Sequence, residues 1–161
     1  MNRVILLFAL LLVAASVEAD SLDRLVRKYK KVDGAVYAAS IEELQKIGKI
    51  KITEKSGDKE IDKFDSFVEK MRRKGVRRVR LLQLDDCRAD TKKAFAREAA
   101  DAVPSAYEGL LRLGDDEDAL SVYLRKCQGY LKILILMWGD DACGFIEVES
   151  DNETLNSLLN F

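Results

Sequence analysis

Four strand-like runs in the second half of the chain constrain the fold more than any other feature of the sequence. Apolar and β-branched residues fill these runs, which occupy residues 107–113, 120–127, 131–138 and 144–149. The three connections are rich in Gly and Asp or consist of Gln-Gly. Short connections of this chemistry join antiparallel neighbours. The pattern therefore predicts an antiparallel four-strand meander.

The run at 131–138 differs from its neighbours because apolar residues occupy both of its alternating positions. A strand that is apolar on both faces is typical of a central strand with cover on each side. In the preceding run, Leu120, Val122 and Leu124 alternate with more polar residues. We therefore expect residues 131–138 near the middle of the sheet.

The first half of the chain has mostly helical patterning. An amphipathic helix begins at Ser21 and a short strand follows at 35–39. Ser40 and Glu43 form a capping box for a second helix, which Gly48 is expected to end. The later elements are a weak strand or connector at 49–54, a turn at 56–58, a helix at 60–73, a strand at 76–84, a helix at 89–102 and a final helix at 153–159 capped by Asn152. Helices first and a meander last predict an α+β fold, with a mostly antiparallel sheet and helices packed largely on one face.

Residues 1–19 have the pattern of a secretory signal peptide. Arg3 supplies a positive charge, residues 4–15 are almost entirely apolar, and Ala19 precedes a plausible cleavage point. The apolar run is shorter than the about 20 residues that a membrane-spanning helix needs. We expect residues 20–161 to form one α+β domain that is exported, periplasmic or secreted, with no transmembrane segment in the mature protein.

The 161-residue chain contains no histidine. This removes the commonest general acid or base, the commonest metal ligand and any imidazole-dependent triad. The sequence also lacks a glycine-rich phosphate loop and a nucleophile elbow. We therefore expect no catalytic residues, no metal and no cofactor.

Acidic pairs at predicted strand ends offer one remaining route to catalysis. Asp85, Asp86, Asp140 and Asp141 are the only candidates for a hydrolase that works through paired carboxylates. Acidic turns that keep the ends of a sheet hydrated explain the same residues, and we favour that interpretation.

Three cysteines, Cys87, Cys127 and Cys143, are an odd number for an exported protein. Their spacing matches no zinc or redox motif. We expect small buried or half-buried thiols, and a disulfide of Cys87 stays open as an alternative.

Charge is divided unequally along the chain. Residues 20–80 contain 18 Lys and Arg against 11 Asp and Glu, whereas residues 81–161 contain 8 against 16. We expect the two halves to lie side by side and neutralise each other. Separate basic and acidic faces are the alternative.

The densest basic segment runs from Lys70 to Arg80. We consider it a candidate surface for a partner or an anionic surface, through Arg72, Arg73, Lys74, Arg77, Arg78 and Arg80. It has no interleaved aromatic residues, so a nucleic-acid partner is not expected. The alternative is a solvated helix end, where cations complement the helix dipole, followed by an edge strand.

Two aromatic residues of the predicted meander, Tyr123 and Trp138, are candidates for lining a ligand pocket. Aromatic residues in strands more often serve in core or cross-strand packing.

Several segments together resemble a family of small exported proteins from Gram-negative gut anaerobes, the domain of unknown function numbered four-two-five-two. The segments are LVRKYKKVDGAVYAA at 25–39, VRLLQLDDC at 79–87, YEGLLRL at 107–113, and the runs at 120–124, 131–138 and 153–159. The resemblance implies export beyond the inner membrane, one α+β domain and no assigned catalytic residues. Family members often carry a lipoprotein cysteine, where this chain has Ala14-Ala15-Ser16.

The sequence supports one leading hypothesis and two alternatives. The first is a non-catalytic binding or adaptor module of the cell envelope, which recognises a protein or an anionic surface through an exposed sheet face or the basic segment. The second is a periplasmic carrier of a small apolar ligand, and the third is the carboxylate hydrolase. A carrier needs an enclosed pocket between helices and sheet, whereas a hydrolase needs two carboxylates at one cleft.

Overall fold

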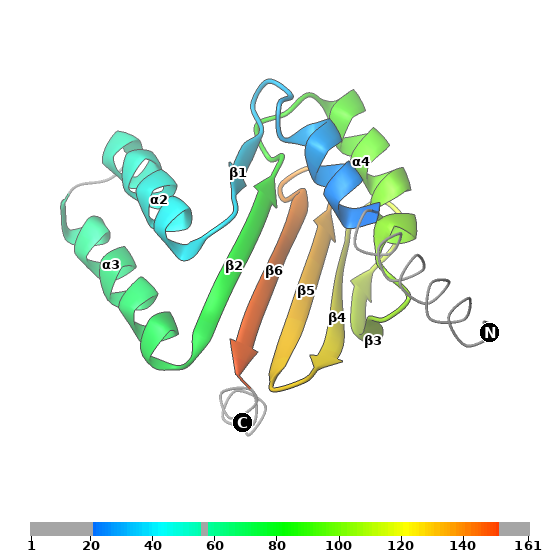
Figure 1. Cartoon of the computed structure of the whole chain (residues 1–161). Coiled ribbons are helices and arrows are strands. Elements are labelled where there is room, and N and C mark those ends of the chain that lie inside the picture. Colours follow the sequence, from blue (N-terminus) through cyan, green and yellow to red (C-terminus); the bar gives the residue numbers. More distant parts are fainter. Residues whose placement is uncertain (1–20, 56–57, 152–161) are drawn as a thin grey trace, which may run out of the picture.

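The computed structural model describes residues 21–55 and 58–151, except for the side chains of residues 49–64 and 67. A six-stranded antiparallel sheet is flanked by helices (Figure 1). The elements after the helical residues 21–29 are β1 (Val36–Ala38), α2 (Ile41–Lys55), α3 (Asp58–Arg73), β2 (Val76–Gln83), α4 (Ala89–Ala102), β3 (Glu108–Gly114), β4 (Ala119–Cys127), β5 (Tyr130–Trp138) and β6 (Gly144–Asp151). The predicted α+β class is confirmed.

The strand order is β1-β2-β6-β5-β4-β3. The last four strands are neighbours in chain order, as a meander requires, but the whole sheet is not a simple meander because β2 pairs with β6. This pairing sets basic residues of β2 opposite acidic residues of β6. Arg78 is the register partner of Glu149, and Arg80 is the partner of Glu147. At this junction the basic and acidic halves of the chain lie side by side.

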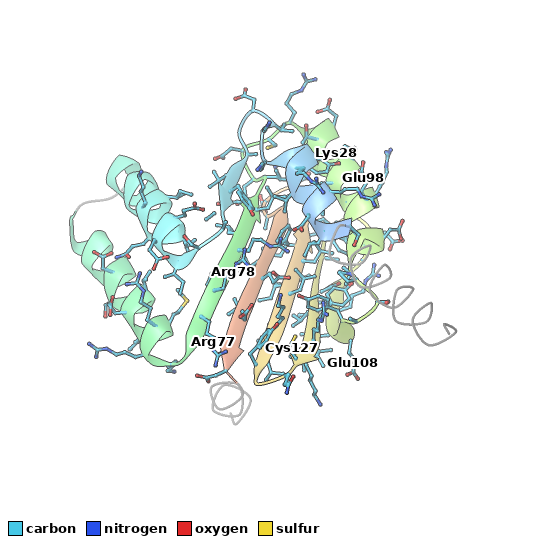
Figure 2. All side chains as sticks on the ribbon, in the orientation of Figure 1. Lys28, Arg77, Arg78, Glu98, Glu108 and Cys127 are labelled. Atoms are coloured by element: carbon cyan, nitrogen blue, oxygen red, sulfur yellow. The ribbon has the colours of Figure 1, made fainter. Side chains whose placement is uncertain are left out.

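One face of the sheet, here called the inner face, is covered by residues 21–29 and α4. Tyr29 meets Phe95 of α4 edge-on, with ring centroids 5.4 Å apart, and Lys28 forms an ion pair with Glu98 across the two helices (Figure 2). The buried side chains of this core include Leu22, Leu25, Val26, Tyr29, Leu82, Phe95, Ala99, Leu134, Leu136, Trp138 and Phe145. The helical residues 21–29 pack on the sheet because Leu22, Leu25, Val26 and Tyr29 form one apolar stripe, which is buried in this core.

The opposite face, here called the outer face, carries a second and smaller core at one side. Ile41 of α2, Val68 of α3 and Val79 of β2 are buried there, and Ile146 and Val148 of β6 pack against them. Helices therefore lie on both faces, where the sequence led us to expect them largely on one. The reason is that Val79, Ile146 and Val148 point away from the inner face and need their own cover.

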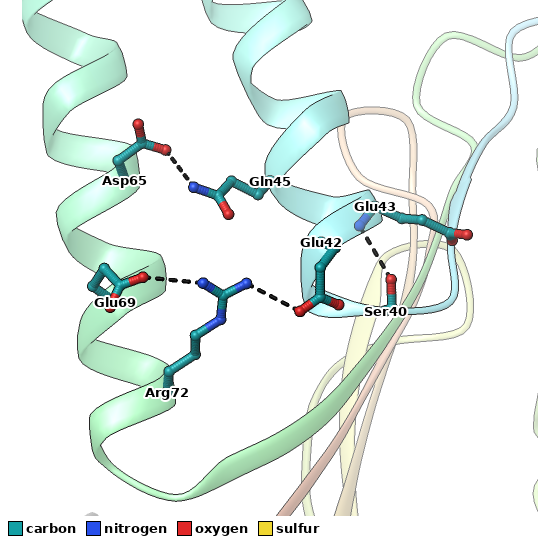
Figure 3. A network of polar contacts seen from close by, with 7 residues as sticks. All are labelled: Ser40, Glu42, Glu43, Gln45, Asp65, Glu69 and Arg72. Carbon is teal, nitrogen blue, oxygen red and sulfur yellow. Dashed lines mark hydrogen bonds and ion pairs between the residues drawn. The ribbon is translucent and has the colours of Figure 1, made fainter.

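The α2 helix is longer than predicted. It continues through Gly48 to Lys55, so the predicted helix end at Gly48 and the predicted strand or connector at 49–54 are wrong. A glycine inside a helix costs only about 1 kcal/mol relative to alanine, a cost that tertiary contacts can offset. Such contacts exist with α3, because the Gln45 side chain donates a 2.8 Å hydrogen bond to Asp65 (Figure 3).

The start of α2 follows the predicted capping box. The Glu43 backbone N–H donates to Ser40 Oγ at 3.1 Å (Figure 3). This bond satisfies an amide group that a helix start leaves without an intrahelical partner. The Glu43 carboxylate accepts a 2.6 Å hydrogen bond from the N–H of Ala39, the residue before Ser40, where a standard capping box would engage the Ser40 N–H.

The other predicted helices and strands occur within about one or two residues of their expected ends. The predicted signal peptide, part of the turn at 56–58 and the final helix at 153–159 lie outside the described residues. Across residues 21–55 and 58–151, no helix has both the length and the apolar character needed to span a bilayer.

Candidate functional site

The start of the predicted basic segment lies at the end of α3. Arg72 is bound on both sides, at 3.1 Å from a Glu42 oxygen of α2 and 3.0 Å from a Glu69 oxygen of its own helix (Figure 3). Arg73 and Lys74 are exposed at the turn into β2. Arg72 thus joins two helices, and its charge is already paired.

The rest of the basic segment lies on β2, where Arg77 and Arg78 are exposed (Figure 2). Arg80 has a side chain only 13% exposed, and it pairs with Asp23 at 2.6 Å and Glu147 at 3.2 Å. Burial opposes the charge of Arg80, but these two carboxylates outweigh that cost and raise its pKa. Of the six predicted basic residues, two are therefore paired with carboxylates, and the other four are exposed: Arg73, Lys74, Arg77 and Arg78.

The interface between the helices and β5 is filled by side chains. Phe95, Leu134, Leu136 and Phe145 have no exposed surface, and Trp138 is only 6% exposed. Tyr123, the other predicted pocket residue, is half-buried and packs against this core. The site expected for an enclosed apolar ligand is thus occupied by the protein itself.

Trp138 also borders an open groove of about 610 Å³ between α4 and the β3–β4 connection. The Arg112 guanidinium lies 5.5 Å from the Trp138 ring centroid and 3.2 Å from an Asp116 oxygen. Lys92, Lys93, Arg97 and several carboxylates complete a charged lining, and Tyr123 takes no part in it. This lining does not suit an apolar ligand.

The four acidic candidates for catalysis differ in their surroundings. Asp85 accepts a 2.8 Å hydrogen bond from the Cys143 N–H, a structural role at the end of β2. The carboxylates of Asp86, Asp140 and Asp141 are exposed. Within the described part of the chain, no group of three or more Cys, Asp and Glu is placed to hold a metal ion.

All three cysteines are free thiols in the structure. Cys87 and Cys143 are buried and Cys127 is half-buried, as predicted. Burial raises the pKa of the Cys143 thiol to about 11 and raises that of Cys87 as well. Both buried thiols are therefore protonated at neutral pH and are poor nucleophiles.

The outer face of β3, β4 and β5 carries an apolar surface that none of these candidate sites includes. Leu110, Leu111 and Leu113 of β3 are 49%, 50% and 57% exposed. The half-buried side chains beside them are Leu120, Val122, Leu124, Leu131, Ile133, Ile135 and Met137. We call these ten residues the outer apolar face. None belongs to the second core under α2 and α3.

Sequence reasoning anticipated an exposed sheet face without assigning its residues. Two sequence patterns indicated these residues. Apolar residues alternate with more polar ones in 120–124, and they occupy both alternating positions in 131–138. What the sequence did not show is that the described side chains of α2 and α3 pack on the β2 and β6 side of the outer face.

Comparisons of the chain with protein-family models, with curated proteins and with solved structures find no match. The family resemblance stays a prediction, and the function must be argued from the geometry.

Proposed function

We propose that the protein is a non-catalytic binding module that recognises a protein partner through the outer apolar face. The observation that carries this proposal is the exposure of about half of each leucine side chain at Leu110, Leu111 and Leu113. Contiguous exposed apolar surface on a folded protein marks an interaction site more often than scattered single residues do.

The dimensions of the outer apolar face suit a protein better than a small molecule. Three strands spaced about 4.8 Å apart, with seven to nine residues each, give a footprint of roughly 15 by 25 Å. The accessible surface area exceeds this flat footprint because side chains project from it. The area per partner then approaches the lower range of specific protein interfaces. One end of the face, at Leu113, Leu120 and Met137, borders an open pocket of about 320 Å³. The other seven residues lie outside the lining of this pocket.

Side chains, and not backbone pairing, are the expected means of recognition. β3 is an edge strand, and its register with β4 shifts between Gly109 and Leu111. A bulge of this kind bends an edge strand and discourages the addition of another strand. A partner with a complementary apolar surface fits this geometry.

The partner is an envelope protein under this proposal, because the predicted signal peptide directs the chain out of the cytoplasm. The two alternative functions receive less support. A carrier of apolar ligands lacks its enclosed pocket among the described residues, since Leu134, Leu136 and Phe145 fill the interface. For a carboxylate hydrolase, Asp85 is already engaged by the Cys143 N–H, and the carboxylates of Asp86, Asp140 and Asp141 are exposed.

Site-specific photo-crosslinking in the native host tests the proposal. A photoreactive benzoylphenylalanine replaces Leu111 in one variant and Arg112 in a matched control, because consecutive residues of a strand point to opposite faces. We expect a discrete protein adduct from position 111 that is several-fold stronger than any adduct from position 112. Adding Leu113→Asp should remove the adduct at position 111.

Equal adducts from both positions, or none from position 111 in a folded and exported protein, would contradict the proposal. An adduct of twice the chain mass would identify the protein partner as a second copy. An adduct of another mass would identify a different protein.

A further inference from the structure

A row of charged residues crosses four strands on the inner face, beside the start of the 21–29 helix. Arg78 of β2 is the register partner of Glu149 of β6, Glu149 is the partner of Lys132 of β5, and Lys132 is the partner of Arg125 of β4. Side chains at paired positions of antiparallel strands point to the same face. We call these four residues the charged row.

Two cations are adjacent in the charged row. Lys132 and Arg125 are direct register partners, and like charges at such positions destabilise a sheet. Lys132 leans toward Glu149, with its Nζ atom 3.8 Å from the carboxylate oxygen. Arg125 is half-buried and forms no hydrogen bond or ion pair with another residue of the described ranges. Arg125 thus stands beside a like charge and has no counterion of its own among the described residues.

The charged row borders a small pocket whose carboxylates are already engaged. Arg78, Arg125 and Lys132 line this pocket of about 190 Å³, together with Arg80 and Tyr107. The Tyr107 hydroxyl donates a 2.6 Å hydrogen bond to Glu147, and Arg80 pairs with both Glu147 and Asp23. These contacts use the two acidic groups of the lining and leave an excess of cations.

Two polar groups of the pocket lining, on Tyr107 and Arg80, are buried. Tyr107 is 9% exposed, and burial followed by its hydrogen bond to Glu147 raises its pKa, so it stays a neutral donor. The buried Nε–H of Arg80 has no hydrogen-bond partner among the described residues. Leu22 and Pro104 complete the lining and limit the access of water on that side.

We propose that this pocket binds a small oxyanion of the phosphate type, with Arg125 and Lys132 as its main ligands and Arg78 as a third. Such an anion would replace the repulsion between Lys132 and Arg125 with two charge-assisted contacts. A guanidinium and an ammonium are the side-chain groups that best bind phosphate oxygens. The pocket volume suits a single phosphate group and is too small for a typical drug-sized ligand. This site lies on the opposite face from the outer apolar face and does not depend on the proposed function.

The test is calorimetric titration of the purified protein with inorganic phosphate, in chloride buffer of matched ionic strength. We expect saturable binding of one phosphate, and Arg125→Ala should weaken it about tenfold or more. Arg77→Ala is the matched control, because Arg77 is an exposed arginine next to Arg78 and lies outside the pocket lining. It should bind phosphate as the parent does. Equal losses in the two variants would overturn the proposal.

Thermal unfolding separates ligand binding from a structural role of Arg125. In phosphate-free buffer, Arg125→Ala should be at least as stable as the parent, because the repulsion with Lys132 is gone. Phosphate should raise the Tm of the parent and leave the Tm of Arg125→Ala unchanged. A lower Tm of the variant in phosphate-free buffer would show a structural role and contradict the proposal.

Vesicles containing phosphatidylglycerol distinguish the source of the phosphate group. Arg125-dependent binding of inorganic phosphate without vesicle binding would assign a free anion. Arg125-dependent binding to these vesicles, absent with neutral phosphatidylcholine vesicles, would assign a lipid headgroup. No Arg125-dependent binding to either probe would overturn the proposal.

Discussion

The two faces of β5 carry similar apolar side chains in very different surroundings. Leu134 and Leu136 point to the inner face and have no exposed surface, whereas Ile133 and Ile135 point to the outer face and are only half-buried. The difference comes from the neighbouring elements, since the residue types are alike. An apolar strand face is therefore a core only where another element covers it.

The order of helices and strands along the chain explains which face of the sheet the helices cover. α4 lies between β2 and β3 in sequence and crosses the inner face next to residues 21–29 (Figure 1). The α2 and α3 pair lies between β1 and β2 and packs its described side chains against β2 and β6. No described helix packs on the outer side of β3, β4 and β5. This asymmetry makes the outer apolar face available for binding.

The largest predicted difference concerns two adjacent residues of β5. Leu136→Ala should lower the free energy of unfolding by about 2 to 5 kcal/mol, because it leaves a cavity in the inner core. Ile135→Ala should cost about 1 kcal/mol, because its side chain keeps part of its contact with water. Urea unfolding of both variants and the parent measures the difference.

Equal losses in the two β5 variants would contradict the account. They would mean that the outer face is covered as completely as the inner face.

A second prediction uses the buried thiol beneath the inner face. The folded pKa of Cys143 is about 11 against an ordinary value of 9.0, so the thiol favours folding below pH 9. That contribution is lost as the pH rises from 9 through 11, and it amounts to roughly 2 to 3 kcal/mol. Stability measured over this range should fall less steeply for Cys143→Ala than for the parent.

Ile135→Ala is the control for this measurement, since it removes no titratable group. Its stability should decline with pH as steeply as that of the parent. If stability fell with pH equally steeply in Cys143→Ala and in the parent, the Cys143 thiol would not be desolvated, and the prediction would be wrong.

A smaller effect is expected where α2 and α3 are joined. Arg72 pairs with Glu42 and Glu69, and the Glu42 side chain is 73% exposed. Arg72→Ala should therefore cost about 0.5 to 1 kcal/mol, as partly exposed ion pairs do. This cost should shrink in 1 M NaCl, and chemical unfolding at low and high salt tests that dependence.

The smallest effect on stability is predicted at Leu113, which is the most exposed leucine of the described residues. Leu113→Asp should change the free energy of unfolding by less than about 0.5 kcal/mol, since an exposed site of an edge strand loses little packing. The same change should reduce binding of an apolar fluorescent dye. A loss above about 2 kcal/mol would be that of a buried core residue and would place Leu113 in a covered interface.

Local patterns predicted most of the helices and strands because each has a short-range cause. The Ser40 and Glu43 capping box, the stripe of Leu22, Leu25 and Val26, and the turns between strands all depend on neighbouring residues. The predicted helix end at Gly48 was wrong because one glycine in a helix costs little free energy. The contacts between α2 and α3 that offset this cost are not local in sequence.

The candidate sites were harder to predict from the sequence. The basic segment is dense along the chain, yet Arg72 and Arg80 are bound by carboxylates from distant elements. The charged row brings together Arg78, Arg125 and Lys132, which only the strand register places side by side. Pairing between distant strands is the information that local patterns lack.

The central claim, that the outer apolar face is uncovered, can be tested most directly by carbene footprinting of the purified full chain. Leu111 and Leu113 on that face are 50% and 57% exposed, whereas Leu136 on the inner face has no exposed surface. We expect several-fold heavier labelling at Leu111 and Leu113 than at Leu136. Labelling of Leu111 and Leu113 as low as that of Leu136 would show that the outer apolar face is covered, and it would contradict this claim.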